Sequence, residues 1–305
     1  MFINIFDVGH GSCSMVTCPN GTRLMIDCGY RLEPPWFPSV AFEDSRINLL
    51  TLLNLDEDHV SDLAYLCRDV PIDSMLSNPT ITARALAAMK RSGGMGNGIQ
   101  MIWRILEHCG PGLIGRIACG GTVRAWAYFN RYGVDFSDTN NLSLAFFVRY
   151  GTFTILFAGD LEAAGWRALL RRPAFVADLA SVTMFVTSHH GRENGCCAEV
   201  FQFCRPEVFV VSDAEHLYAS QDTLDWYRRR AQGIPVLRPW PYGSNQQRFV
   251  LTTRCDGSLH VVVRPDGRYL ITPERPAPEL NWPLEMVEKR RLHASVKYAT
   301  PTYLR

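Results

Sequence analysis

The sequence predicts an α/β protein, because apolar runs alternate with helical stretches and several of the runs end in polar side chains. The apolar runs have the length of buried strands, and stretches with helical periodicity lie between them. Four runs end in residues that can bind a metal: Asp27, the segment 54–59, Asp160, and the pair His189 and His190. Strand ends at one edge of a sheet are where α/β proteins build sites. We therefore expect these four ends to lie together.

Length and composition are those of an ordinary globular protein. The chain has 305 residues, of which 47% are hydrophobic and 20% are charged, so it can bury a sizeable core. The formal net charge is +1. Any surface that binds nucleic acid or a membrane must therefore come from a local patch of charge and not from the charge of the whole chain.

The N-terminus and the cysteines favour a cytoplasmic protein. Residues 1–7 have no basic region and include Asp7, which is typical of a strand start and not of a signal peptide. No apolar run approaches the length of a membrane span, so we expect no membrane partner. The ten cysteines include no Cys-x-x-Cys pair, and we expect them to be reduced and mostly buried.

The first part of the chain predicts strands joined by tight turns. Asn20 and Gly21 form a strong hairpin signal, and residues 31–45 are a Pro-rich, aromatic loop. A helix is expected to continue through residues 62–68. The predicted strands are 2–8, 13–17, 23–27, 49–53 and 70–77.

Residues 80–132 differ from the rest, and we interpret them as a helical, basic insertion between core elements. Helices are expected at 81–90 and 99–108, separated by the Gly-rich break 92–98. The segment has seven Arg and Lys residues against one acid, Glu107. It therefore predicts a local positive surface, although arginines scattered over a solvated helical face would give the same pattern.

From residue 140 onward the β pattern returns. A hairpin is expected from strands 142–150 and 153–158, and a helix follows through residue 170. We assign residues 1–272 to one domain that includes the insertion, and residues 273–305 to a C-terminal tail. Further strands are predicted at 182–187, 208–212, 249–253 and 259–263.

The densest group of polar side chains follows the strand at 49–53. Asn54, Asp56 and Asp58 alternate along the chain, so in an extended segment they point to one side, and His59 comes next. Carboxylates packed this closely repel one another unless a cation lies among them. The segment therefore predicts a site for a divalent metal. The alternative is a solvated turn before a helix, whose N-terminus favours acidic residues.

Six short motifs, in one order, resemble those of a known superfamily. The motifs are Phe6–Ser12, Leu24–Gly29, Asp56-x-Asp58-His59-Val60, Asn140–Leu144, Phe157–Glu162 and Ser188–Gly191. With them the chain resembles the metallo-β-lactamase superfamily over roughly residues 2–265. More narrowly, it is similar to the hydrolase-like domain of competence proteins of the ComEC/Rec2 type, which import DNA. The resemblance implies a four-layer αββα sandwich with a metal site at one sheet edge.

The resemblance implies two metal positions, of which one keeps its expected ligands and the other does not. The second position keeps its ligands, and these predict a bound divalent metal, most readily Zn²⁺. Its oxygen-rich set also suits Mn²⁺ or Mg²⁺. The residues carried over to this position are Asp58, His59, His189 and a bridging Asp160.

The first position departs from the superfamily's usual His-x-His-x-Asp-His motif. Asn54 and Asp56 stand where the two leading histidines are expected, and the region of Asn141 and Ser143 replaces a separate middle histidine. Asn is a poor ligand for zinc. The first position is therefore weakened, with Asp56 as its remaining candidate ligand, and the expected number of ions is one or two.

Catalytic roles are predicted for Asp56, Asp58 and His190. Asp58 holds the metal, and Asp56 or Asp7 accepts a proton from water. His190 positions the substrate or protonates the leaving group; the alternative is a histidine that only supports the ligands. The predicted substrate-binding residues are Asn54, Asn141, Ser143, His10, His216, Arg84, Lys90 and Arg91.

Together these features predict a metal-dependent hydrolase that cleaves a phosphodiester, with nucleic acid as its substrate and partner. One alternative is an enzyme that hydrolyses a small cyclic nucleotide or another ester. A second is a degenerate member of the superfamily that binds a metal or nothing and serves as a regulatory module. The change at Asn54 favours the degenerate module, and the retention of Asp58, His59, Asp160 and His189 opposes it.

Overall fold

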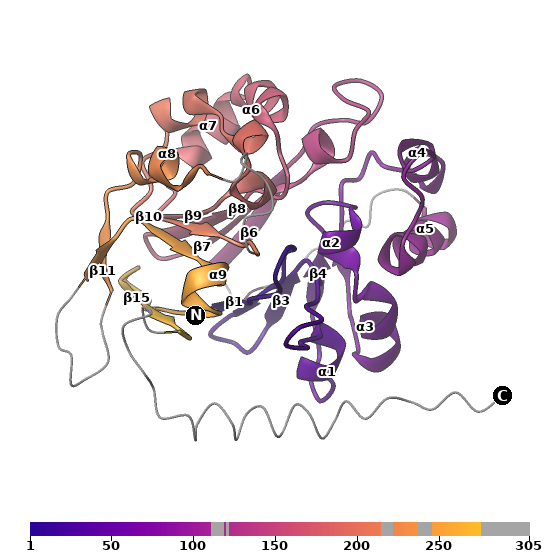
Figure 1. Cartoon of the computed structure of the whole chain (residues 1–305), viewed down its shortest axis with the longest axis horizontal. Helices are drawn as coiled ribbons and strands as arrows, with labels where there is room; N and C mark the ends of the chain where they lie inside the picture. Colours follow the sequence, from indigo (N-terminus) through magenta and orange to yellow (C-terminus); the bar gives the residue numbers. More distant parts are fainter. Residues whose placement is uncertain (111–118, 120–121, 215–221, 237–245, 276–305) are drawn as a thin grey trace.

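Two β-sheets form the centre of the protein (Figure 1). The computed structural model describes residues 1–110, 119, 122–214, 222–236 and 246–275. The first sheet has the strand order β15 (Tyr269–Pro273), β14 (Leu259–Val263), β1 (Phe2–Ile5), β2 (Ser14–Thr17), β3 (Arg23–Ile26), β4 (Leu49–Thr51) and β5 (Met75–Leu76). The second has the order β13 (Val250–Thr252), β10 (Val208–Val211), β9 (Met184–Val186), β8 (Phe153–Phe157), β7 (Ala145–Tyr150) and β6 (Val123–Tyr128).

Helices cover the outer faces of both sheets, as Figure 1 shows. Beside the first sheet lie α1 (Pro38–Ala41), α2 (Glu57–Val60), α3 (Leu63–Asp69), α4 (Ala83–Met89) and α5 (Asn97–Cys109). Beside the second lie α6 (Ala163–Leu170), α7 (Pro173–Leu179) and α8 (Leu224–Arg228). The short helix α9 (Thr253–Asp256) follows β13, and β11 (Ile234–Val236) pairs with β12 (Gln246–Arg248) in a small separate sheet.

Three apolar layers hold these elements together, because side chains alternate along the strands. In β8, Ile155 packs between the two sheets, whereas Leu156 packs toward the helices of the second sheet. In β3, Leu24 packs between the sheets, whereas Met25 packs toward the helices of the first. Helix, sheet, sheet and helix therefore follow one another, and the predicted four-layer αββα sandwich is confirmed.

Parallel strands in each sheet bring the predicted site to one edge. Strands β3, β4 and β5 are parallel, and so are β8, β9, β10 and β13. The chain leaves β3 at Asp27, β4 before the segment 54–59, β8 before Asp160, and β9 before His189 and His190. The carboxyl ends of parallel strands lie at the same edge of a sheet, so the two sheets present these residues to each other there.

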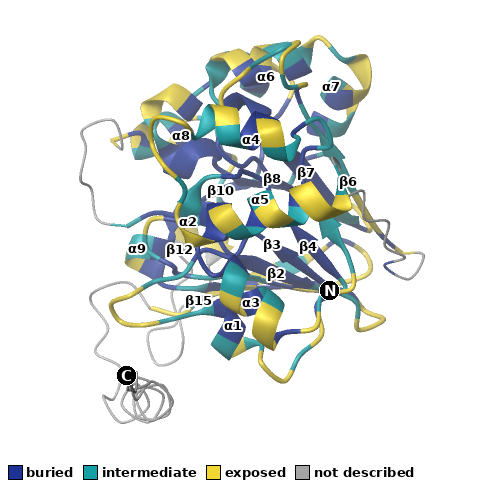
Figure 2. Cartoon of the chain, turned by 90° about the vertical axis from the view of Figure 1, so that its right-hand side faces the viewer, coloured by how far each residue is buried: buried dark blue, intermediate teal, exposed yellow. Residues whose placement is uncertain are grey.

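Among the described residues of the segment 80–132, the helices lie between Ala83 and Cys109. Helix α5 buries Ile99, Ile102 and Leu106 in the outer layer of the first sheet, and Figure 2 shows α5 and α4 with their outer faces exposed. The backbone N–H groups of Gly98 and Ile99, at the start of α5, donate to the carboxylate of Glu57 at 3.0 and 3.1 Å. Residues 123–128 form β6, an edge strand of the second sheet. The segment therefore contributes helices to the outer layer of the first sheet and a strand to the second sheet.

The C-terminal boundary predicted at residue 273 falls at the end of β15, which pairs with β14 in the first sheet. Residues 276–305, most of the predicted tail, lie outside the described residues. All ten cysteines are free thiols. In the part of the chain that the structure describes, no helix has the length and apolar character needed to cross a bilayer.

Candidate metal centre

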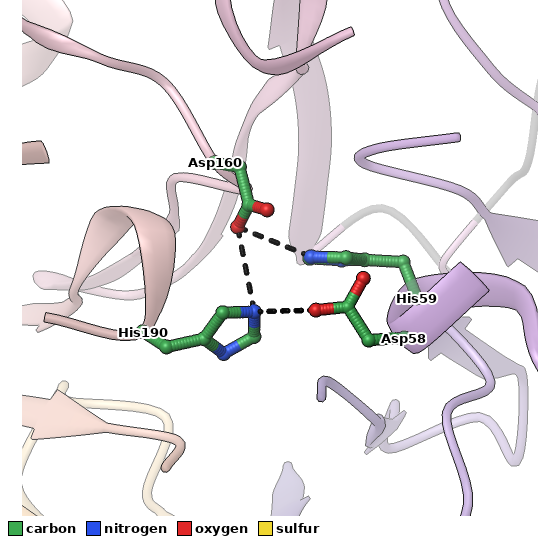
Figure 3. Close-up of side chains that lie close together, drawn as sticks. All are labelled: Asp58, His59, Asp160 and His190. Carbon is green, nitrogen blue, oxygen red and sulfur yellow. Dashed lines mark ion pairs between the residues drawn. The ribbon is translucent and has the colours of Figure 1, made fainter. Parts of the chain in front are cut away.

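Four side chains from three separated segments meet where the two sheets face each other (Figure 3). Asp58 and His59 belong to α2, which follows β4; Asp160 follows β8; and His190 follows β9 in the turn η2 (Ser188–Gly191). One potential ligand atom from each lies within 4.8 Å of the other three. Oδ1 of Asp160 lies 3.1 Å from Nε2 of His59 and 3.6 Å from Nε2 of His190. Oδ2 of Asp58 lies 3.2 Å from the same nitrogen of His190.

Hydrogen bonds behind the two imidazoles determine which nitrogen of each faces this group. His59 uses Nδ1 to donate to Oδ2 of Asp27 at 2.8 Å. His190 uses Nδ1 to donate to the carbonyl oxygen of Ser212 at 2.9 Å. With Nδ1 protonated in each ring, the neutral imidazole presents the lone pair of Nε2 to the group, as metal-binding histidines do.

The atoms that face one another are buried and unsatisfied. Nε2 of His59, Nε2 of His190 and Oδ1 of Asp160 have no hydrogen bond of acceptable geometry among the described residues. Leaving a buried polar atom without a partner costs about 1–3 kcal/mol, and more for a charged group. Three such atoms from three segments point at one place, and a divalent cation there would satisfy all of them.

The electrostatics of the group also indicate a missing positive charge. Burial disfavours the charged imidazole of His59, yet the carboxylates around it, Asp160 foremost, outweigh burial and leave its pKa well above its usual range. Burial raises the pKa of Asp58, but the two neighbouring imidazoles outweigh burial and lower this pKa to about 2. The pKa of Asp160 is lowered in the same way by His59 and His190. The carboxylates are thus stabilised in their charged form and draw cations.

Backbone conformation is unusual at the same place. Asp27, His189 and His190 have φ angles of 57°, 50° and 52°, and in the described part of the chain no other non-glycine residue has a positive φ. Such left-handed conformations cost free energy and tend to gather at functional sites. Here they occur in residues that form, support or adjoin the four-residue group: His190 belongs to it, Asp27 contacts His59, and His189 precedes His190.

Close backbone contacts fix the position of α2. The carbonyl oxygen of His59 accepts from the N–H of Cys28 at 2.8 Å, and that of Asp58 accepts from Ser12 at 3.3 Å. A Cβ on Gly29 would come within 2.3 Å of the Asp58 carbonyl oxygen. Only glycine therefore allows this approach, which holds the Asp58 and His59 side chains over the end of β3.

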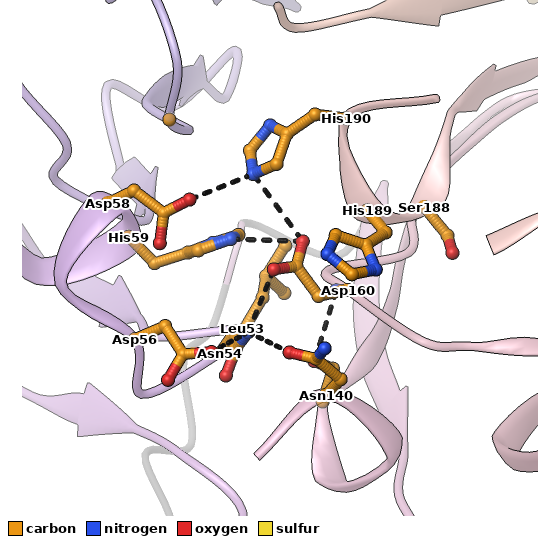
Figure 4. A network of polar contacts seen from close by, with 12 residues as sticks. Leu53, Asn54, Asp56, Asp58, His59, Asn140, Asp160, Ser188, His189 and His190 are labelled. Carbon is orange, nitrogen blue, oxygen red and sulfur yellow. Dashed lines mark hydrogen bonds and ion pairs between the residues drawn. The ribbon is translucent and has the colours of Figure 1, made fainter. Parts of the chain in front are cut away.

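The structure places the predicted ligand Asp56 beside the group rather than within it (Figure 4). The ammonium of Lys90 forms an ion pair with the Asp56 carboxylate, and the hydroxyl of Thr139 donates to it at 3.0 Å. Asn54 donates from Nδ2 to Asp160 Oδ2 at 3.0 Å and lies 3.3 Å from Asp56 Oδ2. Asn54 and Lys90, both predicted to bind substrate, thus contact carboxylates of the site itself.

The structure places His190, and not its neighbour His189, in the four-residue group. Nδ1 of His189 lies 3.8 Å from Glu162 Oε1 and has no hydrogen-bond partner among the described residues. The carboxylate of Glu162 in turn accepts from the amides of Asn140 at 3.2 Å and Asn194 at 2.8 Å. His189 therefore stands beside the site, on the side of Asn140, as Figure 4 shows.

Asn141 and Ser143, predicted to bind substrate, lie behind the site and support it. Asn141 is 5% exposed, and its Oδ1 accepts from the N–H of Gly165 in α6 at 2.8 Å. Ser143 is fully buried, and its hydroxyl accepts from the backbone N–H of Asp160 at 3.1 Å. These contacts position the turn that carries Asp160.

His10 and Arg192 lie on the exposed side of the group. Nε2 of His10 is 3.6 Å from Oδ2 of Asp58, and its ring centre is 4.6 Å from that of His190. Nη2 of Arg192 is 3.3 Å from the same nitrogen of His10. This side of the group thus combines a half-exposed imidazole and a guanidinium, two groups that can contact a substrate.

The remaining predicted residues lie farther out. Arg84 and Arg91 are exposed, in α4 and just after it. His216 lies outside the described residues. Asp7, the other predicted proton acceptor, forms ion pairs with Arg31 and Arg275.

Three contacts of the site were missed from the sequence. The sequence indicated that Asp27 could belong to the site, since Asp27 ends a predicted strand. Its contact with His59, however, depends on the parallel pairing of β3 and β4. Nothing in the sequence indicated the contact between His190 and the backbone carbonyl of Ser212, because every residue has a backbone carbonyl. The pairing of Lys90 with Asp56 joins residues that α2, α3, β5 and α4 separate along the chain.

Comparisons with known proteins give structural similarities only. No protein-family model matches the chain. No curated protein matches it either. CmlA, a diiron β-hydroxylase from Streptomyces venezuelae, is 15% identical, with a TM-score of 0.46 over 75% of this chain and 51% of that chain.

Two further structures are similar over most of their own length. A diphosphatase from the PhnP family is 9% identical, with a TM-score of 0.41 over 85% of this chain and 97% of that one. Zn²⁺-bound PqqB from Methylobacterium extorquens is 11% identical, with a TM-score of 0.42 over 73% and 91%. With every one of these TM-scores below 0.5, the similarities carry no conclusion about ligands or activity. The chain spans about half the length of the hydroxylase structures that it matches.

Proposed function

We propose that the chain is a metal-dependent hydrolase whose centre is formed by Asp58, His59, Asp160 and His190. The observation that carries this proposal is that four potential ligands meet and that three of their buried atoms, Nε2 of His59, Nε2 of His190 and Oδ1 of Asp160, have no hydrogen-bond partner among the described residues. A group built for packing or stability alone would pair its polar atoms with one another or with the backbone. In this group the facing atoms lie 3.1–3.6 Å apart, yet Nε2 of His59, Nε2 of His190 and Oδ1 of Asp160 make no hydrogen bond among the described residues.

The donor set fits a transition metal. Two imidazole nitrogens and two carboxylate oxygens are ligands that Zn²⁺ accepts in a four-coordinate site, and Mn²⁺ tolerates the same donors. A divalent ion held there supplies Lewis acidity and lowers the pKa of water. Asp27 and the Ser212 carbonyl keep the two imidazoles in the tautomer that binds.

The residues around the centre favour an anionic ester as substrate. The guanidinium of Arg192 and the imidazole of His10 lie on the exposed side, where they can bind phosphoryl oxygens and exchange a proton with the leaving group. We therefore propose a phosphodiester as the reacting group. Nucleic acid is the proposed substrate class, because the exposed Arg84 and Arg91 add positive charge on the α4 side.

The test combines metal content and activity. We expect the purified protein to contain zinc or manganese and to hydrolyse bis(p-nitrophenyl) phosphate and a DNA oligomer. The variant Asp160→Asn should lose metal and activity together, because it removes a charged ligand from the centre of the group. As a matched control, Asp178→Asn changes a carboxylate of α7 that binds Trp126 and Tyr128, and it should retain the metal.

Three outcomes would contradict the proposal in whole or in part. A protein that takes up neither zinc nor manganese on incubation is not a metal-dependent hydrolase. A protein that binds metal but cleaves neither substrate would instead support the alternative of a degenerate, regulatory module. Cleavage of cyclic nucleotides without cleavage of the oligomer would support the small-substrate alternative.

A further inference from the structure

The two oxygens of Asp160 face different kinds of partner. Oδ1 faces the imidazoles of His59 and His190, at 3.1 and 3.6 Å. Oδ2 accepts a hydrogen bond from Nδ2 of Asn54 at 3.0 Å. A carboxylate can bridge two metal ions by presenting one oxygen to each ion. Here the place beside the second oxygen is occupied by an N–H donor.

Asn54 is held in the orientation that excludes a metal. Its Oδ1 accepts from the backbone N–H of Leu55 at 2.6 Å, so its NH₂ group is turned toward the carboxylates. Around Nδ2 lie three acceptor oxygens, from Asp160 at 3.0 Å and from Asp56 and Asn140 at 3.3 Å. An amide NH₂ donates hydrogen bonds and offers no lone pair to a cation. The residue therefore occupies the position without ligating.

The positive charge at this place comes from Lys90. Its ammonium forms an ion pair with Oδ1 of Asp56, whose other oxygen lies 3.3 Å from the Asn54 amide. The Lys90 side chain is 14% exposed, so most of its length is enclosed and its charge is directed inward from the end of α4. The attraction between the two opposite charges is stronger in this partly buried place than in open solvent.

We propose that this centre holds one divalent ion and that the ammonium of Lys90 takes the place of a second. The inference rests on the proposed function and goes beyond it by fixing the number of ions and assigning Lys90. A chain of polar contacts runs from the four-residue group through Asp160, Asn54 and Asp56 to Lys90. Figure 4 shows the first three of these residues. A covalently held cation thus pairs with Asp56 at the end of that chain of contacts, and the oxygens of Asp56 and Asp160 that a second metal would need already have partners.

A consequence is that metal binding follows a single-site isotherm. A binuclear centre loads two ions, often with different affinities. The centre described here is complete once the four-residue group is filled, because Asp56 is already neutralised. Lys90 is a positioning residue, since it acts through Asp56 and Asn54 rather than on the reacting atoms.

The test counts zinc ions per chain by elemental analysis after dialysis and by isothermal titration. We expect one ion in the wild-type protein and one in Asn54→His, because in both the ammonium of Lys90 still pairs with Asp56. We expect two in the double variant Asn54→His/Lys90→Ala, in which a histidine, Asp56 and Asp160 form a ligand set and the ammonium is gone. Arg84→Met, which removes an exposed cation from the same helix, should leave the count at one.

The outcomes separate this inference from the proposed function. A wild-type protein that binds no zinc overturns both. A wild-type protein or an Asn54→His variant that binds two ions overturns the assignment of Lys90 and leaves the hydrolase proposal standing. A folded double variant that still binds one ion overturns the assignment as well. If Lys90→Ala prevents folding, Lys90→Gln is used in its place, and circular dichroism verifies the fold of each variant.

Discussion

Nδ1 of His59 lies 2.8 Å from Oδ2 of Asp27, and this contact determines that Nε2 faces Asp160. The other oxygen of Asp27 accepts from the backbone N–H of Leu53 at 2.7 Å. Both oxygens of the Asp27 carboxylate are therefore held in place, and as an anion it accepts a hydrogen bond from Nδ1–H of His59. Its burial ensures that no water competes for this role.

The first prediction replaces this carboxylate by an amide. In Asp27→Asn, the amide oxygen can keep the bond from Leu53, which turns the NH₂ group toward His59. A donor facing Nδ1 favours the tautomer with its proton on Nε2, so His59 loses the lone pair that faces the group. Zinc affinity, measured by titration calorimetry, should fall about 10–100-fold, as for other partners of metal-binding histidines.

Asp62→Asn provides the matched control for this change. Asp62 is also a buried carboxylate near the first sheet, and its Oδ2 accepts from the N–H of Ser39 rather than from the metal group. Zinc affinity should stay at the wild-type value in this variant. Equal affinities in Asp27→Asn and the wild-type protein would mean that Asp27 does not set the tautomer of His59.

The second prediction separates two neighbouring histidines. His190→Ala removes an imidazole from the four-residue group, whereas His189→Ala removes one beside Glu162. We expect the zinc affinity of His190→Ala to fall by more than the roughly 10–100-fold of a supporting residue, and that of His189→Ala to fall less. The reverse order in the same calorimetric titration would return the ligand role to His189, as the resemblance to metallo-β-lactamases implied.

This pair also shows what sequence reasoning can and cannot predict. The strand ends were predictable, because the apolar runs before Asp27, Asp160 and His189 are easy to recognise and parallel strands bring their ends together. Which of two adjacent histidines faces inward depends on the backbone. His189 and His190 both adopt the left-handed region, and no residue pattern indicates this.

The basic segment shows the same limit at the level of side chains. The excess of arginine and lysine in residues 80–132 was visible in the sequence, but Lys90 and Arg91 are adjacent and looked alike. Their difference arises because α4 ends over Asp56, so that Lys90 is enclosed and Arg91 is exposed. Tertiary contacts of this kind follow from helix placement, which local sequence does not specify.

The third prediction concerns stability and pH at Asp62. Burial raises the pKa of this carboxyl from 3.8 to about 6, so between these two pH values the folded state binds more protons than the unfolded state. Stability therefore falls as pH rises through this window, and the loss above pH 6 is on the order of 3 kcal/mol. Asp62→Asn does not titrate and should gain stability over the wild-type protein between pH 4 and pH 7.

Thermal unfolding in the presence of EDTA measures this difference without a contribution from bound metal. The amide can still accept from the Ser39 N–H, so the variant should fold at each pH. The free energy of unfolding of the variant, minus that of the wild-type protein, should rise across the window. A difference that stays constant with pH would show that Asp62 titrates normally.

The last prediction tests the proposed nucleic-acid surface at Arg84 and Arg91. Both are exposed: Arg84 lies in α4, and Arg91 follows the end of α4, next to the enclosed Lys90. Arginines on such a surface pair with backbone phosphates and release counterions, so binding falls steeply with salt. The double variant Arg84→Glu/Arg91→Glu should bind a DNA oligomer more weakly, and the slope of log affinity against log salt should flatten by about 2.

Lys90 is left unchanged in this variant, because altering it would disturb Asp56. Hydrolysis of bis(p-nitrophenyl) phosphate should therefore remain at the wild-type rate, since that substrate is too small to reach both arginines and the metal group. Arg205→Glu is the control, because this exposed residue precedes β10 and so lies at the sheet edge away from the site. Unchanged DNA binding in the double variant would exclude this surface, and the substrate would then be a small ester held by His10 and Arg192 alone.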